Sequence, residues 1–349
     1  MNKRVLIAMS GGIDSSVAAM LLLEQGYELV GVTFRTFDSI RESCLAKEKG
    51  CCSVESIMEA KHLAEQLGFE HHILDFRTIF REHVISNFTS EYMHGRTPNP
   101  CVLCNSHIKW GELLRAADEF DCEKIATGHY ARIRRENDRF YLRRAADQKK
   151  DQTYFLWMLT EQNLSRTIFP LGDLTKDQVR ELARTHGFEK LSQKRESQEI
   201  CFVPNNDYRR FLQEQGCVIE AGDYINSEGQ LLGRHEGFPC YTIGQRKGLG
   251  IALGSPMFVT KIDAETNRVT LGSHDELYTR EVQLRDGFWR GQADEPVLAQ
   301  IRYRSQPTKA TYIPSDQKLI FDEPVWAVTP GQSAVIYQDD CLVGGGFIR

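Results

Sequence analysis

The sequence lacks a long hydrophobic run near its start, where the first uninterrupted apolar stretch is the five residues Val5–Met9. This stretch is too short to span a bilayer or to form the apolar part of a secretory signal. Internal repeats and low-complexity tracts are lacking as well. We therefore expect a cytoplasmic protein that has no membrane partner.

An excess of positive charge is also lacking, because 43 Lys and Arg residues face 48 Asp and Glu residues, for a net charge of −5. This balance excludes a protein that coats nucleic acid by bulk charge, but it leaves room for a local basic surface. Residues 131–150 hold eight Lys and Arg against three Asp and Glu, a local net charge of +5 against −10 over the rest. Alone, this run is typical of an RNA-binding path or of a solvated hairpin.

What is present is a pattern of strands that alternate with helices in the first third of the 349 residues. The pattern predicts a doubly wound parallel α/β sheet, in which ligands bind at the carboxyl ends of the strands. The expected strands are Val5–Met9, 29–34, 72–76 and 124–127, and the expected helices are 15–25 and 54–67.

The later part of the chain has a different sequence pattern. Thr175 and Gln178 have capping-box spacing and begin a helix that ends at His186-Gly187, and 207–215 is another short helix. Beyond about residue 220, short β-like runs between glycine-rich turns predict a small antiparallel barrel at the C-terminus.

The strongest motif is Ser10-Gly-Gly-Ile-Asp-Ser-Ser16, which lies between a strand and a helix. Its two glycines let the backbone approach an anion, and the serines and the helix N-terminus add donors and partial positive charge. The motif lacks the Gly-Lys ending of a Walker loop and the glycine spacing of a dinucleotide fingerprint. It predicts a phosphate cradle; the alternative is a tight turn capped by Asp14 or Ser15.

The ten cysteines of an intracellular chain do not suggest a disulfide framework. Cys101 and Cys104 form a C-x-x-C pair in a proline-containing loop, Thr97–Asn105, ahead of a helix expected from about His107. Such a pair favours a nucleophile or a metal ligand. By its spacing alone, Cys201 is a buried thiol.

Taken together, these segments closely resemble the bacterial tRNA-specific 2-thiouridylases, members of the PP-loop (N-type) ATP pyrophosphatases. The resemblance runs from end to end of the chain. The matching segments are Ser10–Ser16, Thr97–Asn105, 126–130, 150–152, Ser197–Phe202, Tyr241–Gly248, 302–304 and 330–333.

The resemblance implies three domains: a PP-loop catalytic domain over residues 1–205, a central domain over 206–278 and a tRNA-binding barrel over 279–349. Part of 165–190 is expected to pack with the central domain. The implied reaction uses ATP with Mg²⁺ to adenylate the C2 oxygen of the wobble uridine of tRNA. Phe34 falls where the family usually has Met beside the adenine. The implied ATP-binding residues are Ala8, Met9, Ser10, Gly11, Gly12, Ile13, Asp14, Ser15, Phe34 and Gly128.

The resemblance also implies that a persulfide sulfur displaces AMP. Cys201 would carry the persulfide, received from a cysteine desulfurase or a sulfur-relay protein, and Cys104 would attack it to form a disulfide. Position 101 is usually Asp in this family, whereas here it is Cys. An alternative is therefore that Cys101, Cys104 and Cys201 ligate one [4Fe–4S] cluster with an open iron, and a zinc site is a third option.

The remaining implied contacts concern tRNA. Asn99, Pro100 and Cys101 would border the target base. The other implied tRNA-binding residues are His129, Lys150, Asp151, Gln152, Arg302, Tyr303 and Gln332. Two rival functions are another PP-loop ATP pyrophosphatase acting on tRNA, and a non-catalytic RNA-binding protein stapled by a metal ion.

Overall fold

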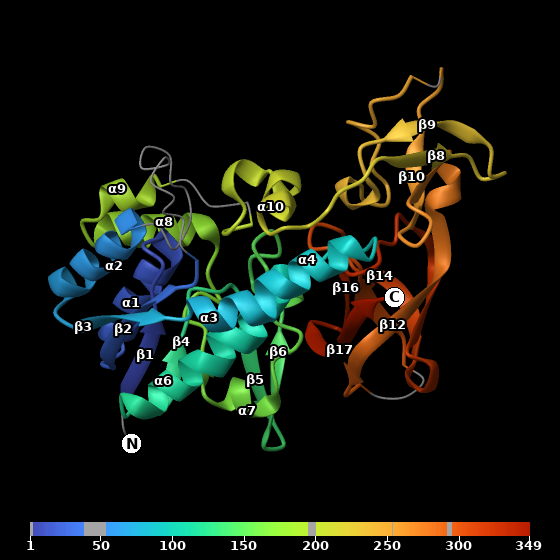
Figure 1. The fold of residues 1–349 in the computed structure, drawn as a ribbon. Coiled ribbons are helices and arrows are strands. Elements are labelled where there is room, and N and C mark those ends of the chain that lie inside the picture. Colours follow the sequence, from blue (N-terminus) through green and yellow to red (C-terminus); the bar gives the residue numbers. More distant parts are fainter. Residues whose placement is uncertain (1–2, 38–53, 195–199, 253, 292–294) are drawn as a thin grey trace. The chain divides into compact units, whose positions relative to one another are not determined.

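The structure is a computed structural model that describes residues 3–37, 54–194, 200–252, 254–291 and 295–349 (Figure 1). These residues form two compact units. The first contains residues up to 84, 101–206 and 340–342, and the second contains 85–100, 207–339 and 343–349. None of the described helices is long and apolar enough to cross a membrane.

The first unit is built on a five-stranded sheet in the order β3-β2-β1-β4-β7, and all of its strand pairs are parallel. The expected doubly wound α/β class is therefore confirmed. The strands are β1 (Arg4–Ala8), β2 (Glu28–Arg35), β3 (Glu70–Asp75), β4 (Lys124–Ala126) and β7 (Thr167–Ile168). The helices with them are α1 (Ile13–Glu24), α2 (Val54–Leu67), α3 (Arg77–Phe80), α6 (Leu113–Glu119), α7 (Glu161–Ser165), α8 (Lys176–Thr185) and α9 (Glu189–Ser192).

One sequence-based expectation in this unit is wrong. The segment that holds Cys101 and Cys104 was expected to be a loop followed by a helix from about His107. Instead, helix α5 (Pro100–Leu103) begins at the proline and continues as the π-helical segment η2 (Cys104–Glu112). Proline at the first helical position has its φ angle fixed for the helix and needs no hydrogen bond there, so it starts this helix rather than preventing it.

The basic run at 131–150 forms a hairpin of strands β5 (Arg132–Glu136) and β6 (Arg139–Arg143). Asn137 and Asp138 make the turn with positive φ angles of 47° and 60°, as a two-residue hairpin turn requires. Strand β6 pairs through Arg143 with Cys341, the first residue of β17 (Cys341–Ile348).

The second unit contains the predicted C-terminal barrel. Its strands run β12-β15-β14-β13-β16-β17, and β12 also pairs with β17, which closes the sheet on itself. A separate four-stranded sheet has the order β10-β11-β8-β9. The additional strands are β8 (Gly222–Ile225), β9 (Leu231–His235), β10 (Phe258–Asp263), β11 (Arg268–Gly272), β12 (Tyr278–Trp289), β13 (Val297–Gln300), β14 (Thr308–Ile313), β15 (Lys318–Trp326) and β16 (Ser333–Gln338).

Helices α4 (Ser86–Met93) and α10 (Tyr208–Glu214) also belong to the second unit. They pack through aromatic pairs: the rings of Phe88 and Phe211 meet edge to face at 5.8 Å, and those of Tyr92 and Tyr208 stack at 4.7 Å. The end of α4 is thereby fixed close to the segment that leads to Pro100.

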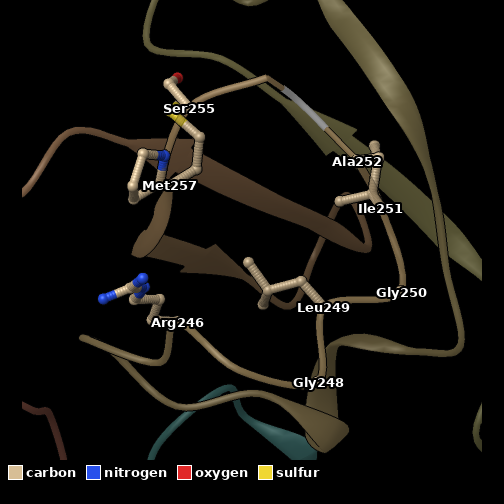
Figure 2. Close-up of a pocket in the computed structure, with 9 residues that line it drawn as sticks. Arg246, Gly248, Leu249, Gly250, Ile251, Ala252, Ser255 and Met257 are labelled. Atoms are coloured by element: carbon tan, nitrogen blue, oxygen red, sulfur yellow. The ribbon is translucent and has the colours of Figure 1, made fainter.

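A hollow of about 470 Å³ lies in the second unit, in the loop between β9 and β10 (Figure 2). Arg246 is the only ionisable side chain that lines it; the other lining residues are Gly248, Leu249, Gly250, Ile251, Ala252, Ser255, Pro256 and Met257. Its described lining residues offer no acid–base pair that could activate Ser255, and the hollow is not a candidate for the catalytic centre.

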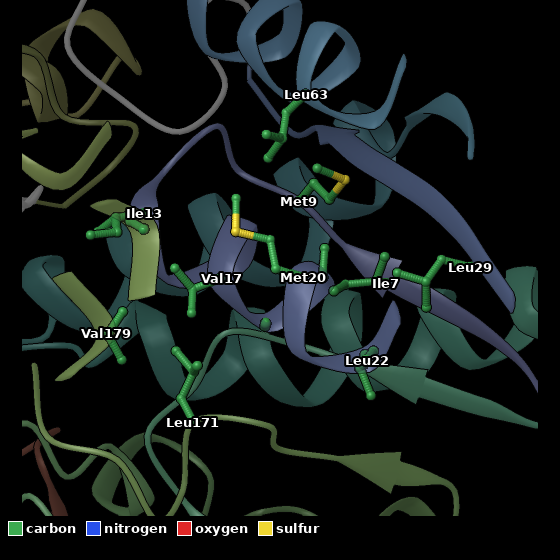
Figure 3. Packing of buried hydrophobic residues seen from close by; sticks show 14 of the residues in the cluster. Ile7, Met9, Ile13, Val17, Met20, Leu22, Leu29, Leu63, Leu171 and Val179 are labelled. Atoms are coloured by element: carbon green, nitrogen blue, oxygen red, sulfur yellow. The ribbon is translucent and has the colours of Figure 1, made fainter. Parts of the chain in front are cut away.

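The hydrophobic core beneath the sheet of the first unit holds the phosphate-loop motif in place. Strand β1 is buried between layers, with Leu6 and Ile7 fully buried. Val17 and Met20 of α1 and Val179 of α8 pack in the same cluster as Ile7 (Figure 3). The start of α1 and the start of α8 are therefore both anchored on this core.

The predicted capping box at the start of α8 is confirmed. Gln178 N donates to Thr175 Oγ1 at 3.3 Å, and Thr175 N donates to Gln178 Oε1 at 2.7 Å. The cap fixes the first residue of the helix, Lys176.

We expect Thr175→Ala to lower the free energy of unfolding by about 1 kcal/mol, because the first turn of α8 loses a hydrogen-bond acceptor. Urea unfolding measures the change. Thr185→Ala at the other end of the helix is the control, since the Thr185 hydroxyl only donates to the Leu182 carbonyl. An equal loss of unfolding free energy in both variants would show that the capping box does not stabilise the helix more than an ordinary side-chain hydrogen bond does.

Candidate functional site

The Ser10–Ser16 motif forms the turn after β1 and the first residues of α1, so it joins the strand to the helix as predicted. Ser15 Oγ accepts a hydrogen bond from Ser10 N at 3.1 Å and donates to Gly12 O at 3.2 Å, while Ser16 Oγ donates to Gly12 O at 2.9 Å. No side chain of the described residues caps the helix at Gly12. The first amides of α1 are thus left for an external acceptor, which is the arrangement of an anion site.

Gly128, at the carboxyl end of β4, lies against this turn. A Cβ atom at Gly128 would lie 2.7 Å from both Asp14 C and Ser15 N, closer than such atoms approach in proteins. Only glycine permits this contact. The structure therefore brings together the loop and Gly128, which were predicted to share a nucleotide site.

Asp14 of the loop forms an ion pair that was missed in the sequence. Lys176 Nζ lies 2.7 and 2.9 Å from the two carboxylate oxygens of Asp14, and Tyr130 Oη donates to Oδ1 at 2.8 Å. Lys176 is only 7% exposed. The capping box marked this helix start, but nothing in the sequence linked it to a residue 162 positions earlier.

A second lysine also reaches the loop. Lys194 Nζ donates to Gly11 O at 3.0 Å and forms an ion pair with Glu59. Two ammonium groups therefore stand at the phosphate-loop motif, each of them paired with a carboxylate.

The ends of β1 and β2 are tied by a hydrogen-bond network. Thr33 Oγ1 donates to Met9 O at 2.9 Å and lies 2.8 Å from His71 Nε2. Because the hydroxyl hydrogen is used on Met9, His71 Nε2 must be the donor to Thr33. Burial lowers the pKa of His71 to about 4, with a smaller contribution from neighbouring His72. The half-buried ring of Phe34 follows, at 5.3 Å from the ring of Phe76.

The predicted cysteines all belong to the first unit. Cys104 is half-buried at the start of η2, whereas Cys101 and Cys201 are exposed. The Cys201 segment is anchored by its buried neighbour Phe202, whose ring contacts that of Phe80 at 5.5 Å. Part of the matching motif, Ser197–Glu199, lies outside the described residues.

Cys101 stands where a carboxylate was expected. Its side chain reaches solvent, but desolvation by the surrounding protein raises the pKa of the thiol, against a smaller opposing effect of Lys109. At neutral pH the group is therefore mainly a neutral thiol and does not reproduce the charge of an aspartate.

A metal centre built from these thiols does not fit the geometry. Among the described residues, no three His, Cys, Asp or Glu side chains are grouped closely enough to hold a metal ion. The expected alternatives of an iron–sulfur cluster or a structural zinc ion on Cys101, Cys104 and Cys201 are therefore not supported.

His129 is held as a neutral base. Lys109 Nζ lies 3.4 Å from its Nε2, so Nε2 accepts, and Nδ1 then donates to Thr127 Oγ1 at 2.8 Å. Desolvation and the charge of Lys109 keep the pKa of His129 well below its usual value. The ring packs on Trp110 at 5.5 Å. A neutral imidazole can meet RNA through hydrogen bonding or stacking, but not as a cation.

The predicted Lys150-Asp151-Gln152 segment is bound closely to its surroundings. Buried Asp151 accepts from Ala145 N at 2.8 Å and from Thr153 Oγ1 at 2.7 Å. Gln152 Oε1 accepts from Tyr130 N at 2.9 Å. These side chains support the backbone near His129, and a contact of this segment with tRNA stays a prediction.

The basic hairpin is more neutral than its sequence indicates. Its arginines pair with carboxylates from elsewhere in the first unit: Arg143 with Asp340, Arg144 with Asp151, and Arg139 with Glu161. Arg134 and Arg135 pair within the hairpin, with Glu136 and Asp138. Three carboxylates outside the run, Asp151, Glu161 and Asp340, thus offset part of the local charge of +5, and Asp340 lies far away in sequence.

The second unit holds the remaining predicted residues. Asn99 and Pro100 are buried at the end of one segment, and Tyr303 is half-buried. Arg302 donates to Ile243 O at 3.1 Å, to Ala327 O at 2.8 Å and to Thr329, so its guanidinium joins the barrel to the loop after Tyr241. Gln332 donates to Thr97 O at 3.0 Å and to Pro98 O at 2.9 Å.

Comparison with known proteins gives three adjoining family matches. Residues 3–205 match a family described as tRNA methyl transferase HUP domain, 209–273 its PRC-barrel domain, and 275–348 an aminomethyltransferase beta-barrel domain. The chain is 48% identical over 363 residues to tRNA-specific 2-thiouridylase MnmA of Cytophaga hutchinsonii, covering 99% of this chain and 97% of that protein. It is 50% identical over 365 residues to the protein of that name from Amoebophilus asiaticus, covering 99% and 95%.

We expect Gly128→Ala to weaken ATP binding about tenfold or more, because the added methyl group displaces the Asp14–Ser15 backbone. Isothermal titration with ATP and Mg²⁺ measures this change. Gly111→Ala is the matched control, since the nearest atom to its added carbon would be Ser106 O at 3.6 Å. Unchanged binding in Gly128→Ala would contradict the proposed contact.

The depressed pKa of His71 predicts a pH dependence of stability. The folded state binds this proton less readily than the unfolded state, so stability is lost as the pH falls from about 6.5 towards 4. We expect His71→Gln to flatten the slope of unfolding free energy against pH in this window. Urea titrations at several pH values measure it, with exposed His62→Gln as the control. Parallel slopes in wild type and His71→Gln would disprove the assignment.

Proposed function

Because the chain belongs to the tRNA-specific 2-thiouridylase family, we propose that it uses ATP to replace the C2 oxygen of the wobble uridine of tRNA by sulfur. The observation that carries the proposal is the phosphate-loop motif, with uncapped α1 amides, the tight approach of Gly128 and two lysines at its edge. This is a site for the polyphosphate of a nucleotide. The cytoplasm, which supplies tRNA and ATP, is the expected compartment.

In the first half-reaction, the uridine C2 oxygen attacks the α-phosphate of ATP and pyrophosphate leaves. The loop amides and Ser10 hold the phosphates, Phe34 contacts the adenine, and Lys176 and Lys194 offset the charge of the departing pyrophosphate. Asp14 offers a carboxylate 31% exposed, a suitable ligand for Mg²⁺, which would neutralise phosphate charge. Adenylation converts a poor leaving oxygen into AMP.

In the second half-reaction, a persulfide on Cys201 attacks C2 through its terminal sulfur, and AMP leaves. The Cys104 thiolate then attacks the Cys201 sulfur and breaks the S–S bond. The freed sulfur stays on C2, and Cys104 and Cys201 are left as a disulfide for an external thiol to reduce. The exposure of Cys201 suits loading by a separate persulfide donor, a cysteine desulfurase or a sulfur-relay protein.

The tRNA would meet both units through the residues predicted for it. In the hairpin, the ion pairs of Arg134 and Arg135 are exposed, and exposed pairs contribute at most about 1 kcal/mol. Phosphate groups can therefore replace their carboxylate partners at little cost. We propose that the arginines of the hairpin act as a cationic surface only when RNA phosphates displace their carboxylate partners.

The decisive experiment incubates the protein with ATP, Mg²⁺, a persulfide donor and unmodified tRNA. We expect AMP, pyrophosphate and 2-thiouridine in equal amounts, measured by chromatography and mass spectrometry of the digested tRNA. AMP without any thionucleoside would refute the proposal. Activity that requires iron, measured after anaerobic purification, would refute the persulfide route.

We expect Cys104→Ser and Cys201→Ser each to reduce thiolation at least a hundredfold, because a hydroxyl cannot carry or release the sulfur. Both variants should still release pyrophosphate from ATP when tRNA is present, since adenylation precedes sulfur transfer. Cys217→Ser, at a half-buried cysteine outside the site, is the control and should keep full activity. A fully active Cys201→Ser enzyme would overturn the role given to that residue.

A further inference from the structure

The segment that leads to Asn99 and Pro100 is held by the barrel through its backbone. Thr97 N donates to Pro330 O at 2.8 Å, and the two carbonyls that follow, Thr97 O and Pro98 O, accept from Gln332 Nε2 at 3.0 and 2.9 Å. A primary amide has two hydrogens to donate, so both are used on this segment. The side-chain amide of Gln332 therefore has only its oxygen, Oε1, left for any other partner.

A buried carboxylate holds the same segment from the other side. Glu91, near the end of α4, is 5% exposed and accepts from Arg96 Nε at 2.7 Å and Arg96 Nη2 at 2.8 Å. Arg285 of β12 donates to its Oε2 at 3.0 Å. The Arg96 backbone also donates to Glu91 O at 2.9 Å. This bidentate pair fixes the residue immediately before Thr97.

The residue between Pro330 and Gln332 must be glycine for these contacts to form. Gly331 has a φ angle of +87°, and a Cβ atom there would lie 2.8 Å from Thr97 O and 3.0 Å from Glu91 Oε2. The barrel turn thus approaches the segment as closely as backbone atoms permit. These three features therefore act together on Arg96, Thr97 and Pro98, the residues that precede Asn99 and Pro100.

We propose that Gln332 and Glu91 are positioning residues, which fix the backbone of Thr97 and Pro98 and thereby set Asn99 and Pro100 against the target base. The inference rests on the proposed function, in which those two residues border the base. It gives Gln332 a different task from that of a tRNA contact. Gln332 acts on the base only indirectly, through its hydrogen bonds to the Thr97 and Pro98 carbonyls. Loss of these donors should therefore misplace the base rather than release the tRNA.

The test replaces Gln332 by Glu, which keeps the shape, removes both donors and sets a carboxylate against two carbonyls. We expect the single-turnover rate of thiolation at saturating tRNA to fall at least tenfold, because small misplacements of a reacting group are costly. The Kd for tRNA, measured by filter binding, should change less than threefold. Gln306→Glu is the control for the added charge, because Gln306 is an exposed glutamine of the same barrel.

Gln332→Met removes the donors without adding charge and must show the same division between rate and Kd. Glu91→Gln should also lower the single-turnover rate of thiolation. Thermal melting confirms that each variant is folded. A Kd raised tenfold with an unchanged saturating rate would overturn the inference and make Gln332 a direct tRNA contact. If neither value changes, the inference also fails. Failure of the wild-type enzyme to thiolate tRNA would instead refute the proposed function.

Discussion

The ion pair between Asp14 and Lys176 is the interaction on which the nucleotide site of the first unit depends. It joins the turn after β1 to the first residue of α8, and both helices rest on one hydrophobic cluster. A buried ammonium group is costly without a partner, so Asp14 is held in one place as long as α8 is folded. The capping box, the hydrogen bond from Lys176 N to the Asp147 carboxylate and the phosphate-loop motif are therefore parts of a single arrangement.

Local patterns predicted what local physics determines. The β1 strand, the helices over 54–67 and 176–185, and the phosphate-loop motif follow from runs of apolar residues, glycines and caps that lie within about a dozen positions. The helix start at Pro100 was predicted wrongly, because prolines were interpreted as loop residues although the first helical position tolerates them. The chemical role of the C-x-x-C pair, inferred from the motif, stays a prediction.

Long-range partners could not be predicted from the sequence. Lys176 meets Asp14, Asp340 meets Arg143 and Gln332 meets Thr97 only after the chain has folded. For the same reason, the charge of the hairpin was overestimated, since a window of twenty residues cannot include a carboxylate two hundred positions away. The resemblance to a known family named Gln332 and Arg302, but it did not reveal that their donors are used within the protein.

The first residues of the last strand have a further consequence. Asp340 and Cys341 belong to the first unit, where Asp340 pairs with Arg132 and Arg143 and Cys341 pairs with the edge of β6. A fragment that ends near residue 205 would leave two arginines without their shared carboxylate and expose the unpaired edge of a β-hairpin, which promotes aggregation. The first unit is therefore completed only when residues 340–342 have been made, well after residue 206, where the rest of the unit ends.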